Sequence, residues 1–474
     1  MAEKKTLSYR FIIIIFIMLI SITLNFTGCP TPNSSDDTDG ESISWEVNNL
    51  TTWADAQYGI SNGGNGKTYI ITVSGNVTIP PTTSLTNTFG SIKNTTIIIQ
   101  GTGTITISDN GYMLYIGNGQ TVRVKNLTLQ GRNNTGSLIG VSSGGTFRME
   151  GSSRVTGNTA SSSSNSSDIY AGGVRISGGT FIMQDEAVVS NNTANTSGIN
   201  REARGGGVYL GSGSFTMRDN AKVENNTASI SSSVNNANGG GVYVDGGTFT
   251  MEGGSISENK VNGGSYGNAR GGGVFVNTSG NFIMRNGTIS GNTLNSADMV
   301  AWGGGVFGAF TMYNGTIKDN KVTLINTGNT GLVEARGGGV NGTLTMHGGT
   351  ISGNTVIAGR TYGNNDVYAF GGGVYGSLTM DGGTISGNTV SASNDINAER
   401  ATANGGGVYA MWSFTKNSGG TIYGNSAAGD LKNIANGGKG HAVFYVVLGG
   451  GNNWRNATAG PSDTSARLDF WLNE

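Results

Sequence analysis

Residues 371–390 read GGGVYGSLTMDGGTISGNTV, and residues 337–356 read GGGVNGTLTMHGGTISGNTV. The same pattern recurs along most of the chain, and its central Met returns every 28 to 34 residues. Its positions are Met149, Met183, Met217, Met251, Met284, Met312, Met346 and Met380, and a weaker ninth copy has Lys416 there. A fixed period of this length indicates a solenoid or a propeller.

Composition and strand patterns decide between the repeat architectures. The chain has 474 residues with 83 Gly and 5 Pro, but no Gly-X-Y period, which excludes collagen. Helical repeats are excluded by runs of three Gly, each costing about 1 kcal/mol in a helix. Each unit carries three short strand-like pieces, as in GVYV, GTFTM and GSISEN within residues 241–259. A propeller blade needs four strands, so the pattern favours one coil of a right-handed parallel β-helix.

The sequence therefore predicts an all-β protein, a right-handed parallel β-helix solenoid with about nine recognisable coils of 28–36 residues. The repeat β-helix spans residues 146–445. Residues 44–145 are expected to form N-terminal β-coils and a cap, with no substantial helix, because short alternating runs follow one another between Gly and Asn turns. Residues 446–474 break the repeat, carry Trp454, Phe470 and Trp471, and are expected to form the C-terminal cap.

One column of the repeat is Asn. It follows the Met position by eight or nine residues, at Asn158, Asn192, Asn226, Asn259, Asn292, Asn320, Asn354, Asn388 and Asn425. An Asn side chain both donates and accepts hydrogen bonds, so stacked copies about 4.8 Å apart form an amide ladder along the axis. The stretches from each Asn to the next GGG vary in length and are polar, which predicts loops on one flank.

Two columns beside the GGG runs are rich in rings and Arg. The column after the Val of GGGV gives a candidate binding stripe of Tyr209, Tyr243, Phe275, Phe307, Tyr375 and Tyr409. If the Val points inward, the period of two turns these rings outward, where they would fit a glycan or a protein. The alternative is that the rings stack inside the tube, although Arg175 and Asn341 in the same column favour exposure. The column before GGG, which includes Arg204, is expected to support loops.

The most charged column follows the Met position. It reads Glu150, Gln184, Arg218, Glu252, Arg285, Tyr313, His347, Asp381 and Asn417. Catalytic sites use paired carboxylates or a metal beside a base, but a row of solvated cross-strand pairs fits this column better. The chain has only two histidines and no Asp-rich calcium repeat. We therefore expect no catalysis, no metal and no cofactor.

The N-terminus predicts export. Lys4, Lys5 and Arg10 precede the apolar run Phe11–Leu24, whose length suits a signal peptide better than a membrane span. Cys29 in NFTGC resembles the lipobox of bacterial lipoproteins, although Phe26 stands where Leu is usual. The resemblance implies a signal peptide over residues 1–28 and a lipid on Cys29, followed by a flexible tether to residue 43. An ordinary exported protein cleaved nearby is the alternative.

The repeats resemble those of pectin-lyase-like β-helix proteins. GGGVY followed by ISxN is similar to the GGA-I and FxxN repeats of polymorphic outer-membrane proteins, with Ile or Val replacing the Phe, over residues 146–445. The chain has a net charge of −1 and no basic cluster beyond its N-terminus, so nucleic acid is not an expected partner.

These features predict a lipid-anchored display or adhesion protein of the bacterial cell envelope, at the outer membrane or cell surface. It would bind a glycan or an extracellular protein. The alternative is a polysaccharide lyase or hydrolase of pectate-lyase-like fold. An enzyme should show acidic and basic residues gathered in a groove across two or three coils, whereas a display rod should show a flat, uncharged, repetitive face.

Overall fold

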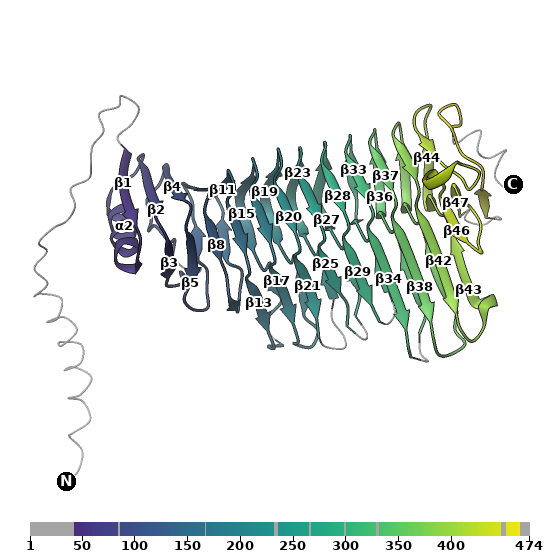
Figure 1. Cartoon of the computed structure of the whole chain (residues 1–474), viewed down its shortest axis with the longest axis horizontal. Coiled ribbons are helices and arrows are strands. Elements are labelled where there is room, and N and C mark those ends of the chain that lie inside the picture. The colour runs from purple at the N-terminus through teal and green to yellow at the C-terminus, as the bar shows by residue number, and fades with distance from the viewer. Residues whose placement is uncertain are drawn as a thin grey trace, which may run out of the picture.

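The computed structural model describes residues 42–83, 86–165, 167–231, 236–264, 267–297, 300–328, 331–446 and 452–464. Cys29, the signal segment and most of the tether lie outside these residues. The described chain is an all-β parallel solenoid of about 9 turns, ~34 residues apart, with 54% of residues in strands. Figure 1 shows the coils stacked side by side along one axis. The predicted all-β solenoid is confirmed.

Four sheets run along the solenoid. Sheet 1 consists of β1 (Ser42–Val47), β2 (Thr68–Val73), β4 (Thr95–Gly101), β6 (Leu114–Ile116), β7 (Gln120–Lys125), β10 (Ile139–Ser142), β11 (Thr146–Glu150), β15 (Val174–Met183), β19 (Val208–Met217), β23 (Val242–Met251), β27 (Val274–Met284), β31 (Val306–Phe307), β32 (Phe310–Met312), β36 (Val340–Met346), β40 (Val374–Met380), β44 (Val408–Lys416), β47 (Val443–Tyr445) and β48 (Asn453–Arg455). Sheet 2 consists of β3 (Asn76–Ile79), β5 (Thr104–Ile107), β8 (Thr128–Gln130), β12 (Arg154–Thr156), β16 (Val188–Ser190), β20 (Lys222–Glu224), β24 (Ser255–Ser257), β28 (Thr288–Ser290), β33 (Thr316–Lys318), β37 (Thr350–Ser352), β41 (Thr384–Ser386) and β45 (Thr421–Ile422).

The other two sheets contain shorter strands. Sheet 3 consists of β9 (Asn133–Asn134), β13 (Thr159–Ser162), β17 (Thr193–Thr196), β21 (Thr227–Ile230), β25 (Lys260–Asn262), β29 (Thr293–Ser296), β34 (Lys321–Asn326), β38 (Thr355–Arg360), β42 (Thr389–Asn394) and β46 (Ile434–Asn436). Sheet 4 consists of β14 (Ile169–Tyr170), β18 (Glu202–Arg204), β22 (Asn236–Asn238), β26 (Ala269–Arg270), β30 (Val300–Trp302), β35 (Val333–Arg336), β39 (Val367–Phe370) and β43 (Ala401–Asn404). Two short 3₁₀ helices, η1 (Ala398–Arg400) and η2 (Gly429–Leu431), lie in the last coils.

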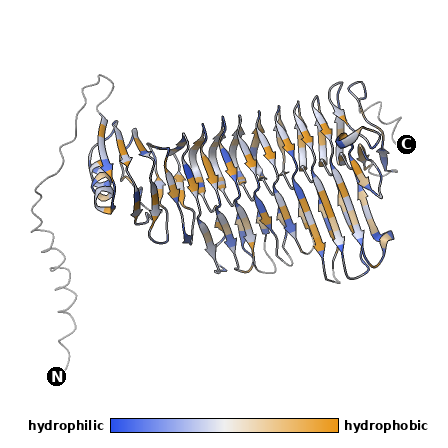
Figure 2. Ribbon diagram, viewed as in Figure 1, coloured by the Kyte–Doolittle hydropathy of each residue, from blue (hydrophilic) through white to orange (hydrophobic). Residues whose placement is uncertain are grey.

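The core between sheets 1 and 2, which we call the main lobe, follows from period-two alternation. In FTM the Phe and Met point inward and the Thr points outward, so each side chain stacks on its equivalent in the next coil. The inward rings Phe215 and Phe249 have centroids 4.7 Å apart, and both are buried. Figure 2 shows hydrophobic residues recurring along the strands from coil to coil.

Sheets 3 and 4 enclose a second, thinner core, which we call the second lobe. Its residues are mostly Ala, with Val, Leu and Ile, and the inward positions of β21 and β22 illustrate it with Ala228 and Ala237. The stretches between Asn and GGG were expected to be loops, and that prediction is wrong because they contain the strands of both sheets. The pattern was inconspicuous because small Ala alternates with polar residues there. Figure 1 shows β17, β21, β25, β29, β34, β38 and β42 in a row beside the main lobe.

The Gly runs form the waist where the two lobes join. The first Gly of each run has a left-handed backbone, as Gly337 does at φ 66°. A Cβ at Gly338 would lie 2.5 Å from the carbonyl oxygen of Gly372 in the next coil. A Cβ at Gly339 would lie 3.0 Å from the Nδ2 of Asn354. The missing side chains let the segment entering sheet 1 pass directly against the Asn turn between sheets 2 and 3.

A helix occupies the N-terminal end of the solenoid, where none was expected. The α-helix α2 (Leu50–Asn62) begins with a capping box, in which the side chains of Asn49 and Thr52 bond each other's backbone N–H. Its buried face holds Trp53, Ala56 and Ile60, at helical spacing. Figure 1 shows α2 beside β1 at the end of the rod. Such a helix covers apolar side chains that the first coil would otherwise expose.

The C-terminal end is closed differently. Strand β48 pairs antiparallel with β47, and Trp454 stacks on Phe444 with centroids 6.4 Å apart. Lys416, in the last Met position, is fully buried and its Nζ donates to the carbonyl oxygens of Gly460 and Asp463 at 2.6 and 2.7 Å. These bonds tie residues after β48 to the last full coil. The predicted cap residues Phe470 and Trp471 lie outside the described residues.

Candidate functional site

A column of Asn side chains runs along the waist. From Asn192 to Asn388, each Nδ2 donates to the Oδ1 of the Asn in the next coil at 2.8–3.1 Å. The same Oδ1 accepts the backbone N–H of the preceding Asn, as in Asn259 to Asn292 at 3.0 Å. The second amide hydrogen goes to a backbone carbonyl, that of Ile256 for Asn292. The buried members predicted from the sequence are Asn158, Asn192, Asn226, Asn259, Asn292, Asn320, Asn354 and Asn388.

The ends of this ladder differ from the prediction. Asn425 is exposed and does not join it, so that assignment is wrong. The position belongs to Asn433, whose Oδ1 accepts both the Nδ2 and the backbone N–H of Asn388, at 3.0 and 2.9 Å. An insertion that includes η2 separates the two, and it displaces the Asn from its usual spacing. At the other end, Asn134 extends the ladder by donating to Asn158 at 3.2 Å.

The candidate binding stripe, which we now call the ring column, faces away from the main core but is not an exposed surface. The Val of each GGGV points into the main core, as expected. The rings stack from coil to coil, with centroids 4.6 Å apart for Tyr243 and Phe275 and 5.2 Å apart for Tyr375 and Tyr409. Four of these rings are buried, namely Tyr209, Tyr243, Phe275 and Tyr375. The other two, Phe307 and Tyr409, are half-buried. The prediction of an exposed stripe is wrong for the four buried rings.

Side chains of sheet 4 cover the ring column. The guanidinium of Arg336 lies 4.7 Å from the ring centroid of Tyr375, and Arg204 lies 5.7 Å from that of Tyr243. Arg204 is held by Asp168 at 3.1 Å and Glu202 at 2.8 Å. Burial raises the pKa of the Tyr243 phenol above its ordinary value of 10.0. The second lobe thus supports the rings instead of leaving them free for a ligand.

The charged column after the Met position forms pairs between neighbouring coils. His347 Nδ1 lies 2.7 Å from Asp381 Oδ2, and the two side chains are 39% and 36% exposed. Tyr313 stacks on His347 at 4.9 Å, and Arg218 lies 3.6 Å from Glu252. Such solvated pairs each contribute a few tenths of a kcal/mol to about 1 kcal/mol. They lie in a row and do not surround a cavity described in this structure.

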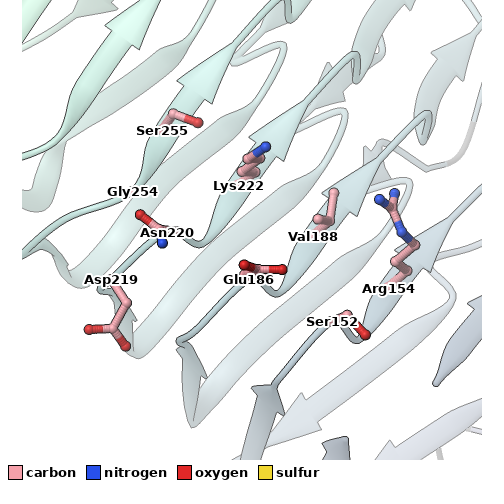
Figure 3. A pocket seen from close by; sticks show the side chains of 9 residues that line it. All are labelled: Ser152, Arg154, Glu186, Val188, Asp219, Asn220, Lys222, Gly254 and Ser255. Carbon is pink, nitrogen blue, oxygen red and sulfur yellow. The ribbon is translucent and has the colours of Figure 1, made fainter. Parts of the chain in front are cut away.

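The N-terminal half of sheet 2 carries a charged depression that the sequence analysis did not identify. Its volume is about 530 Å³, and Figure 3 shows its lining. Arg154, Glu186 and Lys222 come from three successive coils, and Asp219 lies beside them. All four are exposed, and no ion pair joins them in the described part of the chain. Arg154 and Lys222 share one column of the repeat. Glu186 and Asp219 come from two other columns, so only the folded coil brings all four together.

The C-terminal half of sheet 2 carries a different surface, which we call the hydroxyl face. In each strand the middle residue points into the main core, and its two neighbours point outward. The outward residues are Ser255, Ser257, Thr288, Ser290, Thr316, Lys318, Thr350, Ser352 and Thr384, whereas Ser386 in the last of these strands is buried. Their coils pair in register, so the hydroxyls form two columns with one charge, that of Lys318. The repetitive, almost uncharged surface is therefore here and not in the ring column.

No family model, curated protein or solved structure matches this chain. Within the described residues, no three His, Cys, Asp or Glu side chains lie together as ligands for a metal ion. No described helix has the length and apolarity needed to cross a membrane.

Proposed function

We propose that this chain is a display or adhesion protein of the bacterial cell envelope, which binds repetitive glycan or protein ligands through the hydroxyl face. The observation that carries this proposal is the pair of in-register hydroxyl columns on strands β24 to β41. Each hydroxyl both donates and accepts one weak bond. Copies spaced about 4.8 Å apart favour a ligand with its own regular repeat, so that many weak contacts add up.

The proposed site can be tested by adding charge to it. The purified full-length chain in detergent is applied to an array of glycans and matrix proteins, beside the double variant Thr350→Lys and Thr384→Lys. The matched control is Thr345→Lys and Thr379→Lys, which changes the same residue type in the same coils on the outer face of sheet 1. We expect the first variant alone to lose binding several-fold. Equal binding by all three proteins would remove the hydroxyl face from the proposal.

The proposal includes a lipid anchor at Cys29, at the outer membrane or cell surface. It is supported by the apolar run Phe11–Leu24 and by NFTGC. Cys29→Ala should abolish lipid labelling and release the protein from the membrane fraction. Labelling of the variant at the wild-type level would remove the lipoprotein assignment.

A polysaccharide lyase or hydrolase remains the second candidate, and the charged depression on sheet 2 favours it. Acidic and basic side chains from several coils are what acid and base catalysis on a glycan would use. Pectate, alginate, chondroitin and hyaluronan, each with and without Ca²⁺, are the substrates to assay. The adhesion proposal expects no depolymerisation. Turnover that is lost in Glu186→Gln would establish the enzyme instead, provided that it is kept in the control Glu252→Gln, which changes a carboxylate outside the depression.

A further inference from the structure

The ring column extends toward the N-terminus beyond the repeats, and it contains a gap. Gly140 pairs with Tyr115 on one side and with Arg175 on the other, and Arg175 pairs with Tyr209. A side chain is therefore missing at one position between Tyr115 and Arg175. Neighbouring coils lie about 4.8 Å apart, so a stacked ring is absent there.

The gap opens into a pocket of about 320 Å³, which we call the Gly140 pocket. Its lining is Tyr112, Tyr115, Gly140, Val141, Arg175 and Ser177. The rings of Tyr112 and Tyr115 are half-buried, with centroids 5.1 Å apart and tilted by 55°. A Cβ at Gly140 would lie 2.5 Å from Cδ2 of Tyr115, so a larger residue would displace that ring. The volume is at the small end of the range for small-molecule sites.

The pocket is open because the second lobe starts too late to cover it. Sheet 4 begins at β14, and its side chains cover the ring column only from there on. Tyr112 and Tyr115 belong to earlier coils that have no strand of sheet 4. In the repeats, the ring column packs against the second lobe. At this end, no described strand of sheet 4 covers it.

Arg175 brings to the pocket a positive charge that no carboxylate of the described residues neutralises. Its guanidinium lies 4.6 Å from the ring centroid of Tyr170, and its Nε is buried without a hydrogen-bond acceptor. Arg204, one coil further on, pairs with both Asp168 and Glu202. No carboxylate forms an ion pair with Arg175 in the described part of the chain. A guanidinium on an aromatic surface binds a carboxylate through two parallel hydrogen bonds.

We propose that the Gly140 pocket binds a six-membered ring that carries a carboxylate. The ring packs on Tyr112 and Tyr115, and the carboxylate pairs with Arg175. Ser177, exposed at the rim, offers a hydroxyl to the ring substituents. The pocket lies on sheet 1, across the main core from the hydroxyl face on sheet 2, so it goes beyond the proposed adhesion function and does not depend on it.

Two kinds of compound share this chemistry, and the ligands of the test distinguish them. The full-length chain in detergent is titrated calorimetrically with N-acetylneuraminic acid, glucuronic acid and 4-hydroxybenzoic acid, and with glucose and acetate as controls. Binding of the sugar acids alone identifies an acidic glycan, and binding of the benzoate alone identifies an aromatic acid. Either result supports the proposal. Carboxylated rings that bind no better than glucose and acetate would overturn it.

Variants assign the binding to the pocket. Arg175→Gln should weaken binding at least about tenfold, because it removes the charge-assisted pair. Arg285→Gln, which changes an exposed cation directly after β27, is the matched control and should bind as the wild type does. If melting shows that Arg175→Gln does not fold, Arg175→Lys replaces it and should also bind more weakly, since it loses the parallel bonds. Wild-type affinity in a folded Arg175 variant would refute the assignment.

Discussion

The main lobe and the second lobe use the same parallel strand pairing but fill the space between their sheets differently. Stacked Phe, Met, Val and Ile side chains fill the main lobe, whereas Ala dominates the second. Larger side chains bury more apolar area, at roughly 25 cal/mol per Å². The comparison indicates that the main lobe provides most of the stability, and that the second lobe depends on close packing of small residues.

The lobes also change differently along the rod. Sheet 2 strands keep three residues in each coil from β8 to β41. Sheet 3 strands lengthen from four residues in β17 to six in β38. The second lobe thus carries the length variation of the repeat, while the waist keeps both lobes in register.

The largest expected effect is a cavity in the main lobe. Phe249→Ala should lower the free energy of unfolding by about 3–5 kcal/mol, the usual cost of removing a core ring. Phe275→Ala, in the ring column, should cost less, because that ring packs outside the main core. Denaturant melts of both variants measure the difference. Equal losses would mean that the corner beneath sheet 4 is packed as tightly as the main core.

The waist should be the next most sensitive part. Asn292→Ala leaves the backbone N–H and the Nδ2 of Asn259 without their shared acceptor. Unsatisfied buried groups of this kind cost about 1–3 kcal/mol. An unchanged denaturation midpoint for this variant would argue against the ladder.

Overpacking distinguishes the second lobe from a set of loops. Ala358 points into the Ala-rich core, so Ala358→Leu should destabilise the protein by about 1–3 kcal/mol. Ser391→Leu, on the neighbouring strand and half-exposed, is the control and should have little effect. If both variants melt alike, sheets 3 and 4 do not form a packed core.

The end of the ladder gives a smaller effect. Asn433→Ala should cost about 1 kcal/mol, because Asn388 loses the acceptor for two of its donors. Asn425→Ala should leave the thermal midpoint within error, since that side chain is exposed. The opposite ranking would restore the original assignment of Asn425.

The smallest effect concerns pH. Burial lowers the pKa of His441, and its Nδ1 accepts the backbone N–H of Ala435 at 3.2 Å. The unfolded chain therefore takes up this proton first, and stability should fall slightly as the pH drops below 6.5, the ordinary value for His. His441→Gln should flatten the stability curve between pH 7 and 5. A wild-type slope in that variant would exclude His441 as its source.

The sequence allowed the prediction of those features that depend on large side chains or on side chains repeated in nearly every coil. The Val, Phe and Met columns reveal the main lobe by their alternation, and the Asn column reveals the ladder. The second lobe was missed because its strands alternate small Ala with Ser, Thr and Asn, as in residues 227–230, and such a composition is typical of loops. Asn433 was missed because an insertion moved it out of period. Period-two alternation gave the direction of Tyr243 correctly, but not its cover by Arg204, which comes from the preceding coil.

Surface sites were harder to predict for the same physical reason. Arg154 and Lys222 share one column, but Glu186 and Asp219 come from turns at other positions of the repeat. Gly140 lies in a coil before the recognisable repeat, so its place in the ring column appears only in the strand register. A column of the repeat predicts which side chains stack along the solenoid axis. A pocket also depends on side chains from other columns, and the sequence does not show which of these lie beside it.

Hydrogen exchange tests the two-lobed coil most directly. Mass spectrometry of the intact protein can compare β38 (Thr355–Arg360) and β39 (Val367–Phe370) with the residues that connect them, 361–366. Paired strands slow the exchange of their backbone amides. The two-lobed fold predicts slow exchange in both strands, approaching that of β36 in the main lobe, and fast exchange between them. Uniformly fast exchange from residue 355 to 370 would show a loop there and contradict the fold described above.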